Sequence, residues 1–205
     1  MAIAGVILAG GLARRMGGGD KPLRPLAGEP IIGHVIARLR PQVSALAINA
    51  NGDPDRLAGF GLPIVADTIP GHQGPLAGIL AGLRWARDAS PRATHLLTMP
   101  GDTPFLPADL VARLDAARRR AGAQIAQAES DGKLHPVVSL WPLELADPLE
   151  ASLNAGVRRV RAFQSRYSVA VEAFAFEGAD PFHNVNTPED LAEAERLVAR
   201  VAVAG

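Results

Sequence analysis

The sequence has 205 residues, and its 21 Lys and Arg are balanced by 21 Asp and Glu, so no net charge favours nucleic acid or an acidic membrane as a partner. It contains no cysteine, which excludes disulfides, thiolate metal sites and cysteine nucleophiles and suits the reducing cytoplasm. The longest uncharged run, residues 68–83, contains two prolines and is too short to span a membrane. We therefore expect a cytoplasmic protein that binds neither nucleic acid nor membrane.

The N-terminal stretch carries the first functional signal. An apolar run over residues 3–9 predicts a buried parallel strand. The following loop, residues 10–21, holds five glycines, two arginines and a lysine. Glycine leaves backbone N–H groups open to a ligand, and neighbouring cations add positive charge. This loop therefore predicts an anion site, which we interpret as a site for the phosphates of a nucleotide.

The rest of the chain alternates between expected strands and helices. After a proline-broken, irregular segment at residues 22–30, helices are expected at 32–39, 55–58, 76–87 and 107–121, and strands at 45–50, 63–66 and 94–99. This alternation implies right-handed crossovers and a parallel sheet. Beyond it we expect an antiparallel strand pair at 123–128 and 134–141, helices at 145–153 and 156–164, and a strand at 168–173. Thr187 and Pro188 predict the start of a last helix.

This pattern predicts one three-layer α/β/α domain over residues 1–205, with a mostly parallel sheet, a small antiparallel addition and a C-terminal half that adds a lid or second lobe. Ligands of such sheets lie at the carboxyl ends of the strands, so Asn49, Asp67 and Asp102 should converge with the glycine loop. Asp102, held between two prolines, suits a Mg²⁺ ligand that faces nucleotide phosphates. The alternative is that Asp102 only caps the following turn or helix.

Several common enzyme classes lack their motifs in this sequence. It has no phosphate-binding G-x-x-x-x-G-K-[ST], no G-x-G-x-x-G after the first strand and no G-x-S-x-G nucleophile elbow. The five histidines form no H-E-x-x-H and no close pair, so we expect none of them to be a catalytic base.

Residues 8–21 read L-A-G-G-x-x-x-R-M-G-G-x-D-K, a pattern that resembles the molybdenum cofactor guanylyltransferase family and, more loosely, all nucleotidyltransferases of the glycosyltransferase-A-like fold. Further segments fit in the same order along nearly the whole chain: residues 74–78, 100–104, 135–136 and 184–191. The double glycine Gly10–Gly11 is similar to the guanylyl branch, because cytidylyl relatives usually read Ala-Ala-Gly there.

The resemblance implies a substrate and a set of contacts. The family binds GTP through residues that match Leu8, Ala9, Gly10, Gly11, Lys21, Asn49, Asp67 and Asp102 here, and the Asp102 position also holds Mg²⁺. GMP passes from GTP to the terminal phosphate of the molybdenum cofactor, and pyrophosphate leaves. Which of Asn49 and Asp67 contacts the guanine base stays open, and a simple turn role for Asn49 stays open too.

The acceptor phosphate is already ionised near neutral pH, so this chemistry needs no general base and depends on positioning and charge neutralisation. Arg15 and Lys21 are expected to neutralise phosphate charge, against the alternative that both are solvated loop cations. The C-terminal half is expected to bind molybdopterin. Asn184 and Asn186 would contribute to this site, with Asn186 as a second metal ligand, or else only satisfy loop backbone groups.

Two alternatives stay open for Arg158 and Arg159, which could contact the substrate phosphate or lie on a solvated helix face.

Two other functions also stay open for the chain. The chain could be a cytidylyl or sugar-phosphate nucleotidyltransferase of the same fold. It could also be a non-catalytic adaptor that delivers the cofactor, and molybdoenzymes or their chaperones could be partners in either case.

Overall fold

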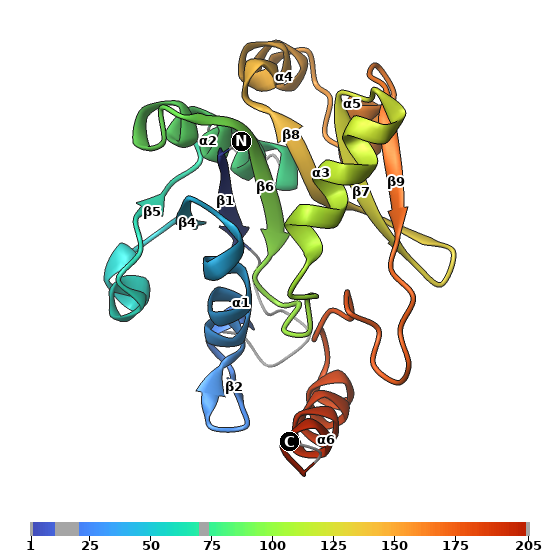
Figure 1. Cartoon of the computed structure of the whole chain (residues 1–205). Helices are drawn as coiled ribbons and strands as arrows, with labels where there is room; N and C mark the ends of the chain where they lie inside the picture. The colour runs from blue at the N-terminus through green and yellow to red at the C-terminus, as the bar shows by residue number, and fades with distance from the viewer. Residues whose placement is uncertain (1, 11–20, 70–73, 204–205) are drawn as a thin grey trace.

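The structure is a computed structural model of the chain and describes residues 2–10, 21–69 and 74–203, with the backbone alone for 200–203. The central element is a seven-stranded sheet of order β5-β4-β1-β6-β8-β7-β9 (Figure 1). Its strands are β1 (Ala2–Leu8), β4 (Ala45–Asn49), β5 (Ile64–Val65), β6 (Ala93–Pro100), β7 (Ile125–Ser130), β8 (Lys133–Pro142) and β9 (Val169–Ala173). Strands β5, β4, β1 and β6 run parallel. The predicted α/β class with a mostly parallel sheet is confirmed.

The antiparallel part of the sheet comes from one inserted strand. β8 lies between β6 and β7 and is antiparallel to both, whereas β9 is parallel to β7 at the sheet edge. β6 and β7 therefore point the same way, and their carboxyl ends lie at the same edge of the sheet as those of β1 and β4. The predicted antiparallel pairing of residues 123–128 with 134–141 is confirmed as the pairing of β7 with β8.

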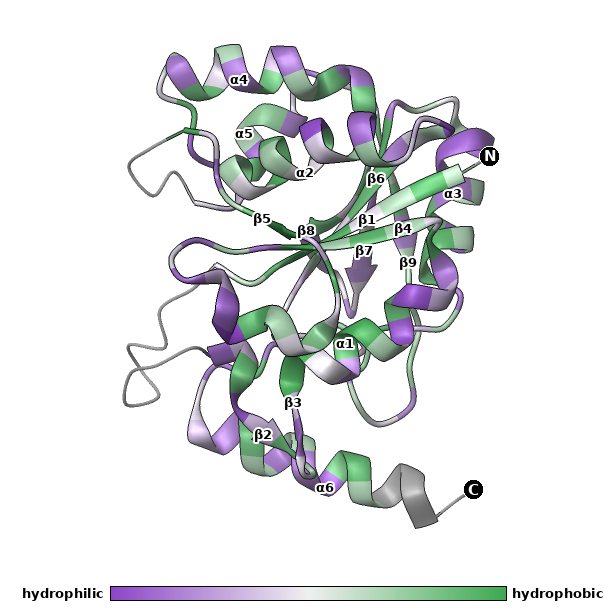
Figure 2. Ribbon diagram, turned by 90° about the vertical axis from the view of Figure 1, so that its left-hand side faces the viewer, coloured by the Kyte–Doolittle hydropathy of each residue, from purple (hydrophilic) through white to green (hydrophobic). Residues whose placement is uncertain are grey.

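Helices cover both faces of the sheet (Figure 2). One face packs on α2 (Pro75–Ala89), α4 (Ala146–Asn154) and α5 (Val160–Gln164), and the other on α1 (Ile31–Leu39) and α3 (Leu110–Ala121). β1 contributes to both cores, with Val6 facing α2 and Ile7 facing α1 and α3, because successive strand residues point to opposite faces. Short 3₁₀ segments complete this region: η2 (Lys21–Leu23), η3 (Arg40–Gln42), η4 (Pro54–Phe60) and η5 (Leu143–Leu145).

A second, small sheet lies outside these layers. Strands β2 (Pro25–Leu26) and β3 (Glu29–Pro30) form an antiparallel hairpin where an irregular segment was expected. Ala27 and Gly28 both have positive φ, as a tight two-residue hairpin turn requires. Leu26 is fully buried against α6 (Pro188–Val203), so the C-terminal helix packs on an N-terminal hairpin.

Two helices, α3 and α5, begin three or more residues after the predicted start. α3 begins at Leu110 rather than at 107, because residues 107–110 form a turn in which the Leu110 N–H bonds to the Pro107 carbonyl. α5 begins at Val160 rather than at 156, since Gly156 has φ of +89° and Arg159 is extended. Among the described residues, no helix combines the length and the apolar character that a bilayer span needs.

Candidate nucleotidyl-transfer site

The end of β1 lies level with the ends of its two neighbours. Leu8 is in register with Asn49 of β4 and with Pro100 of β6. The Ala9 N–H bonds to the Asn49 carbonyl at 2.9 Å, and the Gly101 N–H bonds to the Leu8 carbonyl at 3.0 Å. The strand ends that carry the predicted polar residues are therefore joined directly, as the parallel sheet requires.

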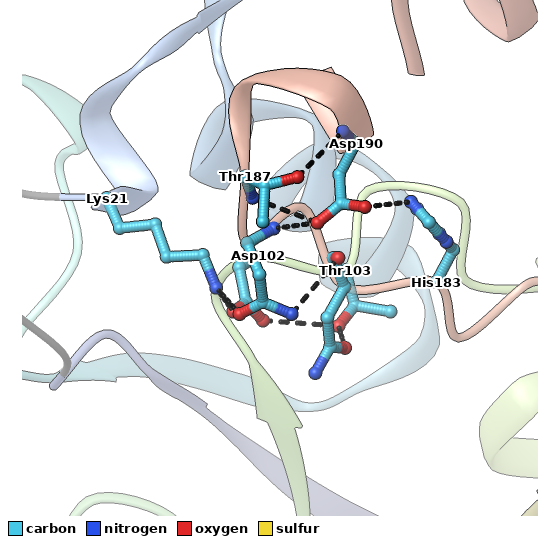
Figure 3. A network of polar contacts seen from close by, with 8 residues as sticks. Lys21, Asp102, Thr103, His183, Thr187 and Asp190 are labelled. Carbon is cyan, nitrogen blue, oxygen red and sulfur yellow. Dashed lines mark hydrogen bonds and ion pairs between the residues drawn. The ribbon is translucent and has the colours of Figure 1, made fainter. Parts of the chain in front are cut away.

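Lys21, Asp102 and Asn186 meet at this edge, although they come from three distant segments. The Lys21 ammonium group donates to Asp102 Oδ2 and to Asn186 Oδ1. The side chains of Lys21 and Asp102 are only 12% and 17% exposed, so the ion pair is partly shielded from water. Figure 3 shows the Lys21 side chain extended toward Asp102. Three residues that the sequence indicated as one site are thus brought into contact.

The loop that carries Asn184 and Asn186 is fixed to the residues after β6. The Thr103 hydroxyl donates to Asn184 Oδ1 at 2.8 Å, and the Val185 N–H bonds to the Asp102 carbonyl at 2.9 Å. Thr103 is fully buried. Sequence reasoning did not assign it a role, because only the tertiary fold brings residue 184 next to residue 103.

Asp190 fixes the other end of this loop. Its Oδ2 accepts the N–H groups of Asn186 and Thr187 at 2.8 and 2.9 Å, and the Thr187 hydroxyl accepts the Asp190 N–H at 3.1 Å. This reciprocal arrangement is a capping box, so the predicted start of α6 at Thr187 is confirmed. Burial raises the pKa of Asp190, but these hydrogen bonds outweigh it and lower the pKa below its usual range. Its other oxygen lies 3.9 Å from His183 Nε2.

Asn49 and Asp67 form a second cluster at the ends of β4 and β5. Asn49 donates both amide hydrogens, to the Val65 carbonyl and to Asp67 Oδ1, each at 2.9 Å. Asn51 donates to Asp67 Oδ2 at 2.8 Å and accepts the Asp67 N–H at 2.9 Å. The Asp67 carboxylate is therefore held by two amides. Asn51 was missed, although it lies two residues beyond Asn49.

A glycine in α2 makes room for this second cluster. A Cβ on Gly78 would lie 2.2 Å from Asn49 Oδ1, so no other residue fits there without moving Asn49. Gly78 belongs to the segment at residues 74–78 that the resemblance identified. Its small size thus sets the position of Asn49.

The remaining site predictions divide into three groups. Leu8, Ala9 and Gly10 lie at the end of β1, with Gly10 exposed. Gly11 and Arg15, by contrast, lie outside the described residues. The Arg158 guanidinium donates to the carbonyls of Leu153 in α4 and of Val157, and Arg158 lies in the loop before α5 rather than on the solvated helix face that was the alternative, so its contact with a substrate phosphate stays a prediction.

Asp102 and Asn186 are the candidate ligands for a divalent cation. The described residues contain no group of three or more His, Cys, Asp and Glu side chains that could enclose a metal. Asp102 and Asn186 nevertheless turn one oxygen each toward the same cation, the Lys21 ammonium group. Carboxylate and amide oxygens suit a hard divalent ion that takes its other ligands from phosphates and water. The residues therefore fit such an ion as a partial protein site.

Comparison with known proteins shows the family of this chain. The model of the MobA-like NTP transferase domain matches residues 5–170. A molybdenum cofactor guanylyltransferase from Rhodopseudomonas palustris (strain BisB5) is 54% identical over 196 residues, covering 95% of this chain and 93% of the relative. The chain belongs to the molybdenum cofactor guanylyltransferase family.

Further relatives support this assignment. A family member from Bradyrhizobium sp. (strain ORS 278) is 52% identical over 199 residues, covering 97% of this chain and 94% of that protein. The crystal structure of a molybdopterin-guanine dinucleotide biosynthesis protein A from Archaeoglobus fulgidus has a TM-score of 0.73, at 22% identity over 96% of this chain and 99% of the other, and so supports the fold. As a member of the family the chain is a nucleotidyltransferase, an enzyme class that implies a divalent metal.

Proposed function

We propose that this protein transfers GMP from GTP to the terminal phosphate of the molybdenum cofactor. An oxygen of that phosphate attacks the α-phosphorus of GTP, a new P–O bond forms, and the bond to the β-phosphate breaks to release pyrophosphate. The acceptor oxygen is already ionised near neutral pH, so no side chain needs to remove a proton. The product is molybdopterin guanine dinucleotide.

One observation carries this proposal. The Lys21 ammonium group joins Asp102 and Asn186, which come from the two halves of the chain, at the carboxyl edge of the sheet. A cation beside a carboxylate and an amide oxygen can hold a triphosphate and neutralise the charge that develops on leaving pyrophosphate. Arg15, outside the described residues, is proposed to add a second positive charge.

On the nucleotide side, we assign GTP to the groups at the ends of β1, β4 and β5. The backbone of residues 8–11 would approach the phosphates. Asn49 and Asp67 would contact the base and the ribose, with the order of the two left open. Because Asn49 donates both amide hydrogens within the protein, its Oδ1 is the atom that remains to accept a bond from a ligand.

We propose Mg²⁺ as the cofactor, held by Asp102 and Asn186. When bound, it would neutralise phosphate charge and polarise the α-phosphate. Asp102 is suited to this role because its backbone carbonyl is fixed by Val185 and its side chain lies beside Lys21. Lys21 would move to the phosphates when the nucleotide and the metal bind.

The acceptor is assigned to the C-terminal half, within one nucleotidyltransferase domain over residues 1–205. Asn184 and Asn186 lie beside Asp102, so a pterin phosphate that enters from this half can reach the α-phosphate of GTP. A cytoplasmic location and delivery of the product to molybdoenzymes or their chaperones are part of the proposal. Cell fractionation and co-purification with a molybdoenzyme test these two points.

The main test is a product assay with the purified chain, GTP, MgCl₂ and intact molybdenum cofactor, in which pyrophosphate and the dinucleotide are measured. We expect both products with GTP and neither with CTP or UTP. Product from CTP or UTP alone would overturn the guanylyl assignment. No product from any nucleotide, while the chain still carries cofactor to an apo-molybdoenzyme, would instead support a delivery adaptor.

A further inference from the structure

The pairing of β8 is irregular over three residues near the carboxyl edge of the sheet. Against β7, the pairing shifts from Gln127↔Ser139 to Ala128↔His135, one step on β7 but four on β8. Against β6, the pairing ends at Thr98↔Ser139, before β6 reaches Pro100. Residues 136–138 therefore form a large bulge, which separates β8 from β6 just where Asp102 follows. Bulges of this kind redirect side chains beside active sites.

The bulge is held by specific bonds. The Ser139 hydroxyl donates to the Pro136 carbonyl at 2.9 Å, and the Gln164 amide donates to the same oxygen at 3.3 Å. The Thr98 hydroxyl donates to the Val137 carbonyl. The backbone is thus fixed by side chains from β6, β8 and α5, and His135 is the first residue on its far side.

His135 is oriented by a chain of polar groups. Its Nε2 lies 2.7 Å from the Ser130 hydroxyl, which donates to Asp180 Oδ1 at 2.8 Å. The Phe182 N–H donates to the same carboxylate oxygen at 2.9 Å, and the Phe182 ring lies 4.9 Å from the imidazole. The ring of His135 is therefore held in one place by packing and by hydrogen bonds.

These bonds determine which nitrogen carries the proton. A serine hydroxyl has one hydrogen, and Ser130 gives it to Asp180, so Ser130 must accept from His135 Nε2–H. Burial lowers the pKa of His135, and the charge of Asp180 only partly opposes this shift, so the neutral ring prevails near neutral pH. Nδ1 then carries a lone pair.

That lone pair is open to a ligand. No described residue bonds to His135 Nδ1. Among the described residues, the side-chain polar atoms that are both fully buried and without a hydrogen-bond partner are Arg118 Nε and His183 Nε2, so His135 Nδ1 is not fully buried. Solvent can therefore reach it, which makes it a fixed hydrogen-bond acceptor.

The acceptor atom lies at one end of the loop that reaches the reaction centre. Ser130 ends β7, whose carboxyl end shares an edge with that of β6. From Asp180 the chain runs through Phe182 to Asn184 and Asn186, which contact Thr103 and Lys21. His135 thus lies at the same carboxyl edge of the sheet as Asp102, near the carboxyl end of β7, and outside the groups assigned to GTP.

We propose that His135 Nδ1 accepts a hydrogen bond from an N–H donor of the acceptor substrate and so positions its heterocycle while the phosphate reaches Asp102. A pterin carries such donors on its ring and its exocyclic amine. The inference rests on the proposed function and names a substrate-binding residue within it. Ser130 and Asp180 act as positioning residues through His135.

Two substitutions separate binding from structure. In His135→Gln the amide nitrogen can still donate to Ser130, but the acceptor at the Nδ1 position is lost. In His135→Asn the amide oxygen can occupy the Nδ1 position, but the bond to Ser130 is lost. We expect the KM for the cofactor to rise about fivefold to tenfold in His135→Gln and less in His135→Asn, with the KM for GTP unchanged in both.

The outcomes are distinct. If the wild type forms product but His135→Gln leaves the KM for the cofactor unchanged, the inference is overturned and the proposed function stands. A smaller rise of this KM in His135→Gln than in His135→Asn has the same meaning. No product from the wild type overturns the proposed function and this inference with it. If a variant misfolds, ¹⁵N-histidine NMR of the wild type with molybdopterin provides the test. The Nδ1 resonance must move toward the hydrogen-bonded range, and an unmoved resonance contradicts the proposal.

Discussion

The Lys21 ammonium group pairs with the Asp102 carboxylate although 81 positions separate the two residues. The same ammonium group contacts Asn186 Oδ1, so a protein cation lies against the two oxygens assigned to the divalent metal. A lysine in this place balances the Asp102 charge before substrates arrive. In the proposed function, the metal would then compete with Lys21 until nucleotide phosphates draw the lysine away.

The first prediction concerns this competition. Lys21→Met should raise the affinity of the nucleotide-free protein for Mn²⁺ about fivefold, because a partly shielded ion pair worth about 1 kcal/mol no longer opposes the metal. GMP transfer should fall by about 10²-fold, since a cation that stabilises the phosphates is lost. Electron paramagnetic resonance of Mn²⁺ measures the first effect and product formation the second. Weaker Mn²⁺ binding in the variant would contradict the competition.

The second prediction addresses Asp102. Asp102→Asn should lower product formation by about 10²- to 10³-fold, because the only carboxylate assigned to the metal is lost. Asp131→Asn is the matched control, since Asp131 lies in the exposed β7–β8 turn with φ of +48°, which asparagine tolerates. Rates are measured under saturating GTP and MgCl₂. Equal rates for the two variants would remove Asp102 from the catalytic site.

The third prediction uses two glycines on one face of α2. In Gly78→Ala the new Cβ would collide with Asn49 Oδ1 at 2.2 Å, whereas in Gly82→Ala it would meet Val6 Cγ1 at 2.7 Å. Both variants should lose about 1–3 kcal/mol of unfolding free energy through overpacking. Only Gly78→Ala should weaken GTP binding, by tenfold or more, measured by calorimetry on folded protein. Equal GTP affinities would mean that Asn49 does not bind the nucleotide.

The fourth prediction concerns stability against pH. Burial, aided by the charge of Arg118, lowers the pKa of His95 from 6.5 to about 4. Between these two pH values the unfolded chain binds a proton that the folded chain does not. The contribution of neutral His95 to the free energy of unfolding is therefore fully present above pH 6.5 and is lost as the pH falls toward 4. The loss is about 3 kcal/mol. Denaturant unfolding of His95→Asn should show a smaller slope over this range, and an unchanged slope would contradict the assignment.

Local signals in the sequence were sufficient for most elements. The apolar run before Gly10 predicted β1 because a strand buried on both faces needs no polar side. Thr187 and Pro188 predicted the start of α6 because a helix terminus needs a cap for its free N–H groups. Asp102 was predicted as a site residue because a polar residue directly after a buried parallel strand lies at the carboxyl edge of the sheet, where ligands bind. These features depend on a few neighbouring residues, and sequence patterns carry that information.

Long-range contacts between side chains could not be predicted from the sequence in the same way. The sequence by itself determined the α/β class, most of the helices and strands, and the residue types that could hold a phosphate or a metal. Only the tertiary structure placed β8 between β6 and β7, paired Thr103 with Asn184, and seated Leu26 of the small hairpin under α6. Each of these contacts joins segments that are not neighbours in the sequence. The packing of whole elements, rather than any local pattern, therefore decides which side chains touch.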